Sequence, residues 1–347
     1  MKALIYHGPN SKTVEDRPKP VIHDADDAVV KMTHTTICGT DLHILKGDVP
    51  TCDPGRILGH EGVGIVESVG SSVTRFKTGD RVLISCITAC GKCDYCRRGM
   101  YSHCETGGWI LGHRIDGTQA EYVRIPHADT SLYPLKDGVD AEACVMLSDV
   151  IPTAFECGVL NGKLEDPGIN VAIVGAGPIG LATVLTAQFF SPGKTIVIDR
   201  DLNRLAEAKR LGATDVIDVK AGDPVAQVMS LTGGIGADAV IEAVGTPEAF
   251  GLCQDIVAPG GRIANIGVHG KKVDLHLEKL WSQNIAITTR LVDTVTTHIL
   301  LKAVESGKLS PSALISHRFD FANILDAYDT FTRAPETRAL KVLIAVA

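Results

Sequence analysis

The pattern of apolar and polar positions changes near residue 153 and divides the chain into two parts. Before that point the chain has short β-prone runs separated by clusters of Gly, Pro and Asp, at 1–6, 28–32, 62–69, 81–85 and 120–125. No long helical period occurs in this part. We therefore expect a β-rich first domain.

Beyond residue 153, continuous apolar runs alternate with segments of helical spacing. The runs lie at 170–174, 194–199, 215–218, 237–243, 262–266 and 285–289, and the helical segments begin at 178 and cover 201–211, 224–231, 247–257 and 275–283. Continuous apolar strands are typical of a sheet buried on both faces. Six such strands alternating with helices predict a doubly wound parallel sheet, so the fold class is α/β.

The end of the chain contains another strand-like run, at 339–345, after the doubly wound part. We expect the segment from residue 291 onward to return to the first domain. The predicted domains are therefore 1–152 together with 291–347, and 153–290. A length of 347 residues also favours two domains.

Composition and charge narrow the function classes. The chain has 34 Lys and Arg against 41 Asp and Glu, a net charge of −7, and no basic stripe, so nucleic acid is not an expected partner. The longest apolar region, 171–190, is interrupted by Gly and Pro, and no signal peptide is visible. We expect no membrane span and a cytoplasmic location, where the ten cysteines stay reduced and some bind metal.

A G-x-G-x-x-G sequence, Gly175-Ala176-Gly177-Pro178-Ile179-Gly180, follows the strand predicted at 170–174 and opens a helix. Its glycines permit a tight turn, close approach of a pyrophosphate, and close packing of helix on strand, with the phosphate at the positive end of the helix dipole. Asp199 ends the next strand and is placed to accept hydrogen bonds from the ribose hydroxyls of NAD. Two alternatives stay open: a plain glycine turn with Asp199 as a helix cap, or another ligand such as S-adenosylmethionine.

Four cysteines follow the spacing C-x2-C-x2-C-x7-C, at Cys90, Cys93, Cys96 and Cys104. Four thiolates so close in sequence can close a tetrahedron around Zn²⁺, and such a site without an open position is structural. The alternatives are a disulfide pair, which conflicts with a reducing compartment, and an iron–sulfur cluster, for which no electron-transfer context is present.

A second candidate metal site contains Cys38 and His60, in the segments Cys38-Gly39-Thr40-Asp41-Leu42-His43 and Gly59-His60-Glu61-Gly62. A thiolate and an imidazole both suit zinc. A catalytic zinc site usually has three protein ligands and one open position, so a third ligand must come from elsewhere in the chain.

Taken in their order along the chain, these motifs resemble the zinc-dependent alcohol dehydrogenases of the medium-chain dehydrogenase/reductase family, over essentially the whole length. The pattern is most similar to the bacterial secondary-alcohol dehydrogenases. The resemblance implies a GroES-like catalytic domain, with a structural zinc lobe at about 86–105, and a Rossmann cofactor domain. It also implies two zinc ions per subunit.

The resemblance further implies the third ligand and the substrate pocket. Asp149, in the segment 147–153, stands where this family supplies its third zinc ligand, although it could instead cap the helix near Pro152. Trp109 is similar to a tryptophan that lines the pocket in the secondary-alcohol subgroup, and ordinary packing is the alternative. Cys86 and Leu291 are implied pocket residues on the same ground.

Three residues near the open site resemble the family's catalytic groups. Glu61 resembles a carboxylate beside the zinc, Thr40 a hydroxyl relay, and His43 the imidazole that passes the proton to solvent. A hydroxyl can both donate and accept, and an imidazole titrates near neutral pH. The alternatives are a surface salt bridge for Glu61, a cap for Thr40 and a surface histidine for His43. His113 is assigned no role.

The cofactor assignment combines chemistry and resemblance. Asp199 would repel the 2′-phosphate of NADP, so we expect NAD, although the similar bacterial subgroup often uses NADP. Arg200 complicates this choice, and we expect it to stack on the adenine. The resemblance places the backbone of Val268 near the nicotinamide carboxamide. Lys341 is expected to face the pyrophosphate, with a solvated charge as the alternative.

The predicted activity is hydride transfer between NAD(H) and a small, secondary alcohol or the corresponding ketone or aldehyde. A polyol dehydrogenase of the sorbitol or butanediol type is the alternative. A binding module that uses the cysteine lobe as a zinc ribbon is opposed by the acidic balance and the complete dinucleotide unit. The expected partners are a small-molecule substrate and further copies of the chain in a homotetramer, because the stretch between Cys104 and Ala120 lacks the insertion of larger dimeric relatives.

Overall fold

The computed structural model describes residues 1–346, and the chain divides into two compact units. The first unit comprises Met1–Asp149 and Asp293–Ala347, and the second comprises Val150–Val292. The first unit is therefore built from both ends of the chain, and the second is continuous in sequence.

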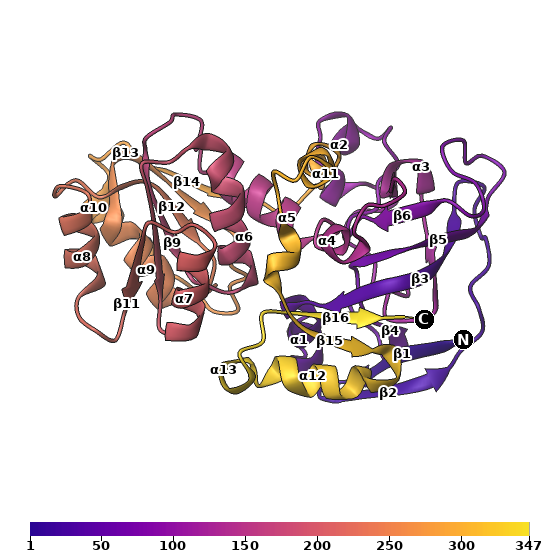
Figure 1. Cartoon of the computed structure of the whole chain (residues 1–347). Coiled ribbons are helices and arrows are strands. Elements are labelled where there is room, and N and C mark those ends of the chain that lie inside the picture. The colour runs from indigo at the N-terminus through magenta and orange to yellow at the C-terminus, as the bar shows by residue number, and fades with distance from the viewer. Residues whose placement is uncertain (347) are drawn as a thin grey trace. The chain divides into compact units, whose positions relative to one another are not determined.

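The second unit is built on a six-stranded parallel sheet with helices on both of its faces (Figure 1). Its strands follow the order β11 (Asp215–Asp218), β10 (Lys194–Asp199), β9 (Asn170–Val174), β12 (Ala237–Glu242), β13 (Val257–Asn265) and β14 (Ala286–Thr289). Numbered along the unit this order is 3-2-1-4-5-6, which is the doubly wound dinucleotide-binding topology that the alternation of patterns predicts. Side chains of β9, including Val171 and Ile173, are fully buried, as expected of a central strand covered on both faces.

The helices of the second unit begin at residues that favour helix starts. They are α5 (Val150–Thr153), α6 (Pro178–Ala187), α7 (Leu202–Arg210), α8 (Pro224–Leu231), α9 (Pro247–Ile256) and α10 (Leu277–Leu280), with short 3₁₀ turns elsewhere. Asp201, Asp223 and Thr246 cap α7, α8 and α9 through their side-chain oxygens. Two local features differ from the sequence expectation: 275–283 forms only the short α10, and Ala154–Leu160 forms a π-helix.

The first unit contains two sheets. A seven-stranded sheet follows the order β15 (Ile315–Asp320), β16 (Lys341–Ala345), β3 (Ala28–Ile37), β5 (Gly62–Val69), β6 (Arg81–Ile84) and β8 (Leu132–Pro134), with β7 (Tyr122–Ile125) also paired to β3. A three-stranded sheet contains β2 (Ser11–Asp16), β1 (Lys2–Gly8) and β4 (Arg56–Ile57). Strand β16 runs antiparallel to β3, so the end of the chain does return to the first domain.

Short helices complete the first unit: α1 (Gly39–Lys46), α2 (Asp94–Arg97), α3 (Ala128–Ser131), α4 (Ala141–Val145), α11 (Thr297–Glu305), α12 (Ile324–Thr332) and α13 (Ala334–Thr337). One apolar core joins β3, β5, β6 and β16 to α12, whose Tyr328 is fully buried. Helix α1 is too short to give a helical period in the sequence, and a capping box between Cys38 and Asp41 starts it. This helix carries two of the predicted site residues, Thr40 and His43, and a third, Cys38, is its N-cap.

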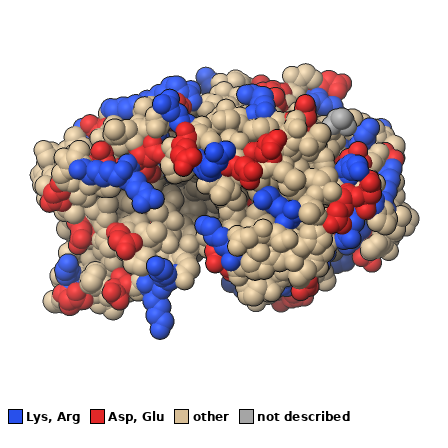
Figure 2. Space-filling view, turned by 90° about the horizontal axis from the view of Figure 1, so that it is seen from below, with Lys and Arg blue, Asp and Glu red and all other residues tan. Residues whose placement is uncertain are grey.

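Two further features of the structure concern its surface charges and the lengths of its helices. On the face shown in Figure 2, basic side chains are interspersed with acidic ones. Within residues 1–346, every helix is too short or too polar to cross a bilayer.

Candidate functional site

Three separate segments of the first unit bring Cys38, His60 and Asp149 together. The Oδ2 atom of Asp149 lies 3.6 Å from the Cys38 Sγ atom and 3.3 Å from the His60 Nε2 atom. The Ser148 hydroxyl accepts from the Gly62 N–H at 3.0 Å, which holds Asp149 beside the segment that carries His60. The three-residue set that the resemblance implied is thus a real cluster in space.

The donor atoms of this cluster fit a zinc ion. Ligands at zinc bond lengths of about 2.0–2.3 Å lie roughly 3.3–3.8 Å apart in a tetrahedron, and the distances within the cluster agree. All three donor atoms lie within 4.8 Å of one another. A sulfur, an imidazole nitrogen and a carboxylate oxygen fill three positions and leave a fourth for an exchangeable ligand, which is the arrangement of a catalytic site.

A buried carboxylate that the sequence analysis quoted without a role lies on the other side of the His60 ring. The Oδ1 atom of Asp41 lies 4.0 Å from the His60 Nδ1 atom, and its Oδ2 atom accepts from the Cys38 N–H at 2.9 Å. A histidine that binds metal through one nitrogen commonly donates from the other to a carboxylate. The signal in the sequence was the position of Asp41 three residues after Cys38, which also places it in the capping box of α1.

Glu61 and Lys341 form a buried ion pair beside the cluster, and Thr36 also hydrogen-bonds the Glu61 carboxylate. The Lys341 ammonium donates to the Ile37 carbonyl at 3.3 Å, and its side chain is only 2% exposed. In this structure Glu61 already neutralises the Lys341 charge inside the first unit, and contact of Lys341 with a pyrophosphate stays a prediction. Burial opposes that charge, but Glu61 outweighs the effect and the pKa of Lys341 is raised.

Thr40 and His43 both lie on α1, which begins directly after Cys38. The Thr40 Oγ1 atom is 3.7 Å from the Cys38 Sγ atom. His43 lies nearly one turn further on, is 38% exposed, and contacts Asp48 through its Nδ1 atom at 2.9 Å. One residue is thus close to the cluster and the other reaches solvent, as a proton path would require.

Of the predicted pocket residues, the structure brings Cys86 to the cluster, with its Sγ atom 3.7 Å from the Asp149 Oδ1 atom. Trp109 is half-buried and stacks on His113, with ring centroids 4.2 Å apart. His113 was missed because nothing in the sequence pairs it with Trp109. Leu291 belongs to the second unit, is 44% exposed, and stays a prediction.

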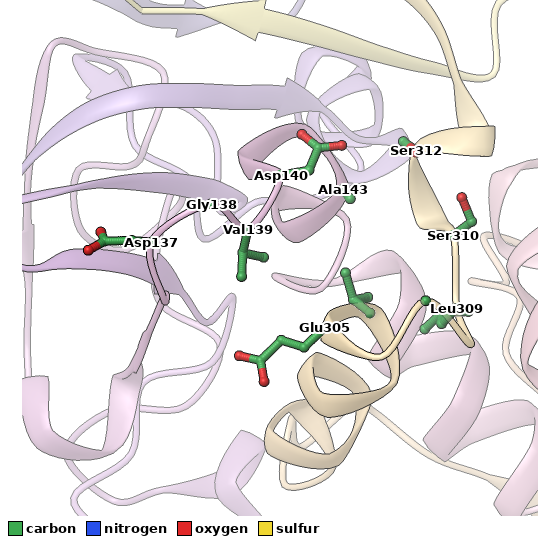
Figure 3. A pocket seen from close by; sticks show the side chains of 11 residues that line it. Asp137, Gly138, Val139, Asp140, Ala143, Glu305, Leu309, Ser310 and Ser312 are labelled. Carbon is green, nitrogen blue, oxygen red and sulfur yellow. The ribbon is translucent and has the colours of Figure 1, made fainter.

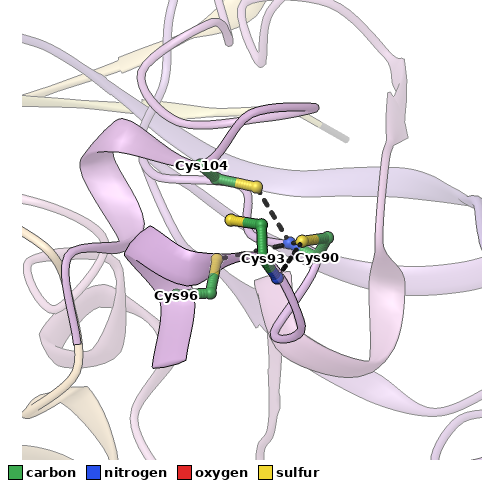
Figure 4. Close-up of side chains that lie close together, drawn as sticks. All are labelled: Cys90, Cys93, Cys96 and Cys104. Carbon is green, nitrogen blue, oxygen red and sulfur yellow. Dashed lines mark hydrogen bonds between the residues drawn. The ribbon is translucent and has the colours of Figure 1, made fainter. Parts of the chain in front are cut away.

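The four cysteines of the lobe converge in the first unit, as Figure 4 shows. The Sγ atoms of Cys90 and Cys96 are 3.9 Å apart, close to the separation of two thiolates on one zinc ion and too far for a disulfide. Burial opposes ionisation of Cys90, but backbone N–H groups of Lys92 and Cys93 outweigh it and lower the pKa of that thiol to about 6. The donor set fits zinc and leaves no position open.

The glycine loop of the second unit has the backbone that its sequence predicts. Gly175 has a φ of 104°, and a Cβ at Gly180 would lie 1.8 Å from the Gly175 carbonyl oxygen. Gly177 is the N-cap of α6, with Pro178 and Ile179 in the first turn. The Asp199 carboxylate accepts from the Ala176 N–H at 2.6 Å, so the strand end and the loop are held together.

The same carboxylate accepts from the N–H groups of Arg200 and Asp201. Arg204 is the cation that the sequence analysis missed: its guanidinium would lie 3.9 Å from a Cβ at Gly177. Arg204 lies five residues after Asp199, in the first turn of α7. This spacing in the sequence could have pointed to it, because a residue in the first turn of that helix stays close to the end of the preceding strand. Val268 follows β13 and is 68% exposed.

A cavity of 490 Å³ in the first unit lies away from these residues (Figure 3). Asp137, Asp140, Glu305 and Ser312 are among the residues that line it. Two of these carboxylates have structural partners, since Asp140 accepts from the Glu142 N–H and Glu305 binds Lys136. The cavity contains none of the predicted site residues.

Comparisons with known proteins agree with this geometry. Residues 24–137 match the family profile "Alcohol dehydrogenase GroES-like domain", and residues 178–304 match "Zinc-binding dehydrogenase". An alcohol dehydrogenase of Cupriavidus necator is 36% identical over 95% of this chain and 95% of its own. The solved structure of zinc dependent alcohol dehydrogenase 2 from Streptococcus pneumonia has a TM-score of 0.94 at 52% identity and covers 99% of this chain and 98% of its own.

Alcohol dehydrogenase TADH from Thermus sp. ATN1 is similar over 100% of both chains, with a TM-score of 0.93 at 34% identity. These relatives cover at least 95% of the chain, and so both of its units. The chain therefore belongs to the zinc-dependent alcohol dehydrogenases of the medium-chain dehydrogenase/reductase family.

Proposed function

We propose that the chain transfers a hydride between NAD(H) and a small, secondary alcohol or the corresponding carbonyl compound. The observation that carries the proposal is the open three-donor cluster of Cys38, His60 and Asp149. A closed set of four donors would serve only structure, whereas three donors leave room for a substrate oxygen. Zinc at that cluster supplies Lewis-acid polarisation of the alcohol oxygen, and a nicotinamide ring supplies the hydride acceptor.

The residues of α1 would carry the alcohol proton. The Thr40 hydroxyl lies beside Cys38 and can accept a proton while donating another. The exposed His43 can release that proton to water. The buried Glu61, ion-paired with Lys341, keeps a second carboxylate near the cluster, and its Oε1 atom has no hydrogen-bond partner among the described residues.

NAD is the proposed cofactor because Asp199 stands where the adenosine ribose would lie, at the end of β10. The relatives support a nicotinamide cofactor of either kind: one structure at 27% identity is complexed with NADH, and another at 27% identity is bound to NADP. Arg200 directly follows this carboxylate and the Arg204 guanidinium lies beside the glycine loop, so the balance of charge in this region decides between the two cofactors.

The proposed substrate class rests on Trp109, which the resemblance assigns to the substrate pocket. Trp109 is a large apolar surface, which favours a small hydrophobic secondary alcohol. One observation favours a polyol instead: the His113 imidazole adds a polar group against the Trp109 ring. A sorbitol dehydrogenase of Bacillus subtilis is 33% identical over 77% of this chain.

Two further parts of the proposal concern composition and assembly. Two zinc ions per chain follow from the two donor clusters. A homotetramer would cover the edge strand β14, whose Ile287 is 37% exposed, and the neighbouring Trp281, which is 79% exposed. Large apolar side chains beside an unpaired strand edge favour pairing with another copy.

The test is absorbance at 340 nm during incubation of the purified chain with NAD or NADP and a panel of secondary alcohols, primary alcohols and polyols. We expect turnover with NAD and a small secondary alcohol, and about two zinc ions per chain by metal analysis. Turnover with polyols alone would replace the substrate class, and no turnover with any alcohol or carbonyl compound would overturn the proposal.

A further inference from the structure

A chain of four buried polar groups runs from α12 to the candidate zinc ligand His60. The Tyr328 hydroxyl donates to the Gln119 Oε1 atom at 2.7 Å. The Gln119 Nε2 atom donates to the Asp41 Oδ2 atom at 3.1 Å and to the Thr36 carbonyl at 3.1 Å. Asp41 then faces His60 with its other oxygen.

The donors and acceptors in this row of hydrogen bonds fix the orientation of the Gln119 amide. The Thr36 carbonyl can only accept, so the amide nitrogen of Gln119 must face it and the neighbouring Asp41 carboxylate. That leaves the Gln119 carbonyl oxygen for Tyr328, whose hydroxyl must donate. Burial raises the pKa of Tyr328, so the phenol keeps the proton that this bond needs.

The carboxylate of Asp41 is divided between two tasks. Its Oδ2 atom accepts from the Gln119 amide and from the Cys38 N–H. Its Oδ1 atom has no hydrogen-bond partner among the described residues and points to the His60 Nδ1 atom. The bonds to one oxygen thus fix the direction of the other, and with it the side of the imidazole that faces Cys38 and Asp149.

We infer that Tyr328 and Gln119 are positioning residues of the catalytic metal centre, which act through Asp41 on the orientation of His60. This inference rests on the proposed function, because it assumes that His60 binds zinc. It assigns a role to α12, an element more than two hundred residues from Cys38 in sequence. Gln119 also packs closely against the residue that precedes His60, since a Cβ at Gly59 would lie 2.6 Å from the Gln119 side chain.

The test measures how fast zinc leaves each site when the intact chain meets an excess of a coloured chelator. We expect two kinetic phases of zinc release, one from each site. A Cys38→Ala variant should lack one of them, and that phase belongs to the catalytic site. We expect Tyr328→Phe to speed that phase about threefold to tenfold, somewhat less than the 10- to 100-fold loss of metal affinity typical of a direct partner of a ligand. Release from the four-cysteine site should not change.

Tyr133→Phe is the matched control, because the Tyr133 hydroxyl also donates one hydrogen bond, to the Thr294 carbonyl at 2.8 Å. Gln119→Met, which keeps the length of the side chain, should act at least as strongly as Tyr328→Phe. The double variant should then resemble Gln119→Met alone, since the hydroxyl acts through the amide. In cobalt-substituted protein, Tyr328→Phe should also shift the visible absorption bands of the catalytic ion, and Tyr133→Phe should not.

Two results overturn the inference in distinguishable ways. If the wild-type chain binds two zinc ions but Tyr328→Phe and Gln119→Met release them no faster than Tyr133→Phe, the inference alone is wrong. If the wild-type chain holds zinc only in the four-cysteine site, the proposed function and the inference fall together. Should Tyr328→Phe not fold, Gln119→Met against the same control decides the question.

Discussion

The first unit contains two clusters of side chains that could hold a metal ion, and they differ in how the chain assembles them. Cys90, Cys93, Cys96 and Cys104 lie within one short segment, and their sulfurs converge by local turns and the short helix α2. Cys38, His60 and Asp149 come from three segments, and the first and last are 111 residues apart in sequence. The local cluster is closed, and the dispersed one is open.

This difference shows what holds the donor atoms of each cluster in position. The local cluster needs few contacts outside its own segment, so metal and backbone define each other. The dispersed cluster depends on bonds from neighbouring elements, such as those of Ser148 to Gly62 and of Asp41 to Cys38. A catalytic site gains from this dependence, because supporting bonds hold its ligands in one geometry while a position stays free for substrate.

The largest expected effect comes from removing one ligand of the open cluster. Cys38→Ala should lower turnover by at least about 10³-fold, because metal-ion polarisation contributes several kcal/mol to catalysis. The melting temperature should change little, which scanning calorimetry would show. Cys52→Ala, a change at a buried cysteine outside both clusters, is the control and should keep turnover. A folded and fully active Cys38→Ala variant would show that Cys38 is not a ligand of a catalytic metal.

Loss of the Thr40 hydroxyl should have the next largest effect. Thr40→Ala should reduce turnover about 10²-fold, the lower range for a positioned proton-transfer group, and leave the Kd for the cofactor unchanged. Thr40→Ser keeps the hydroxyl and should keep much of the activity. Steady-state kinetics and cofactor titration of both variants check this, and equal behaviour of Ser and Ala would contradict the relay.

The closed cluster should respond in stability. Cys96→Ala opens the lobe and should lower the melting temperature by roughly 5 °C, as a loss of about 3–4 kcal/mol does in a chain of this length. The fraction that stays folded should keep its turnover. Cys144→Ala, at a fully buried cysteine outside both clusters, gives the comparison for a buried thiol alone. If Cys96→Ala instead abolishes turnover in stable protein, the contrast between the clusters is wrong.

The smallest effect concerns the glycine loop of the second unit, a local motif like the cysteine lobe. The ratio of kcat/KM for NAD over NADP should exceed one and should fall at least about fivefold in Asp199→Gly, because more than ~1 kcal/mol of repulsion disappears. Asp201→Asn removes a neighbouring charge while keeping the cap of α7, and should leave the ratio unchanged. A wild-type preference for NADP would overturn the cofactor assignment.

The same contrast separates what the sequence could predict from what it could not. The glycine loop, the four cysteines and the six parallel strands follow from spacing, because each is set by nearby residues. The resemblance suggested Asp149, but no local pattern links it to Cys38. The ion pair of Lys341 with Glu61 joins segments far apart in sequence, and the stack of His113 on Trp109 follows no regular spacing, so the sequence analysis found neither contact.

The pairing of β16 with β3 also affects the order in which the chain can fold during synthesis. At about 5–20 residues per second, the 304 residues between Ile37 and Lys341 take roughly 15–60 s to translate. Throughout that time the first unit lacks an interior strand of its main sheet, and Glu61 lacks its buried cation. The continuous second unit has no such wait. A nascent chain should therefore complete the second unit first and close the first unit only after β16 leaves the ribosome.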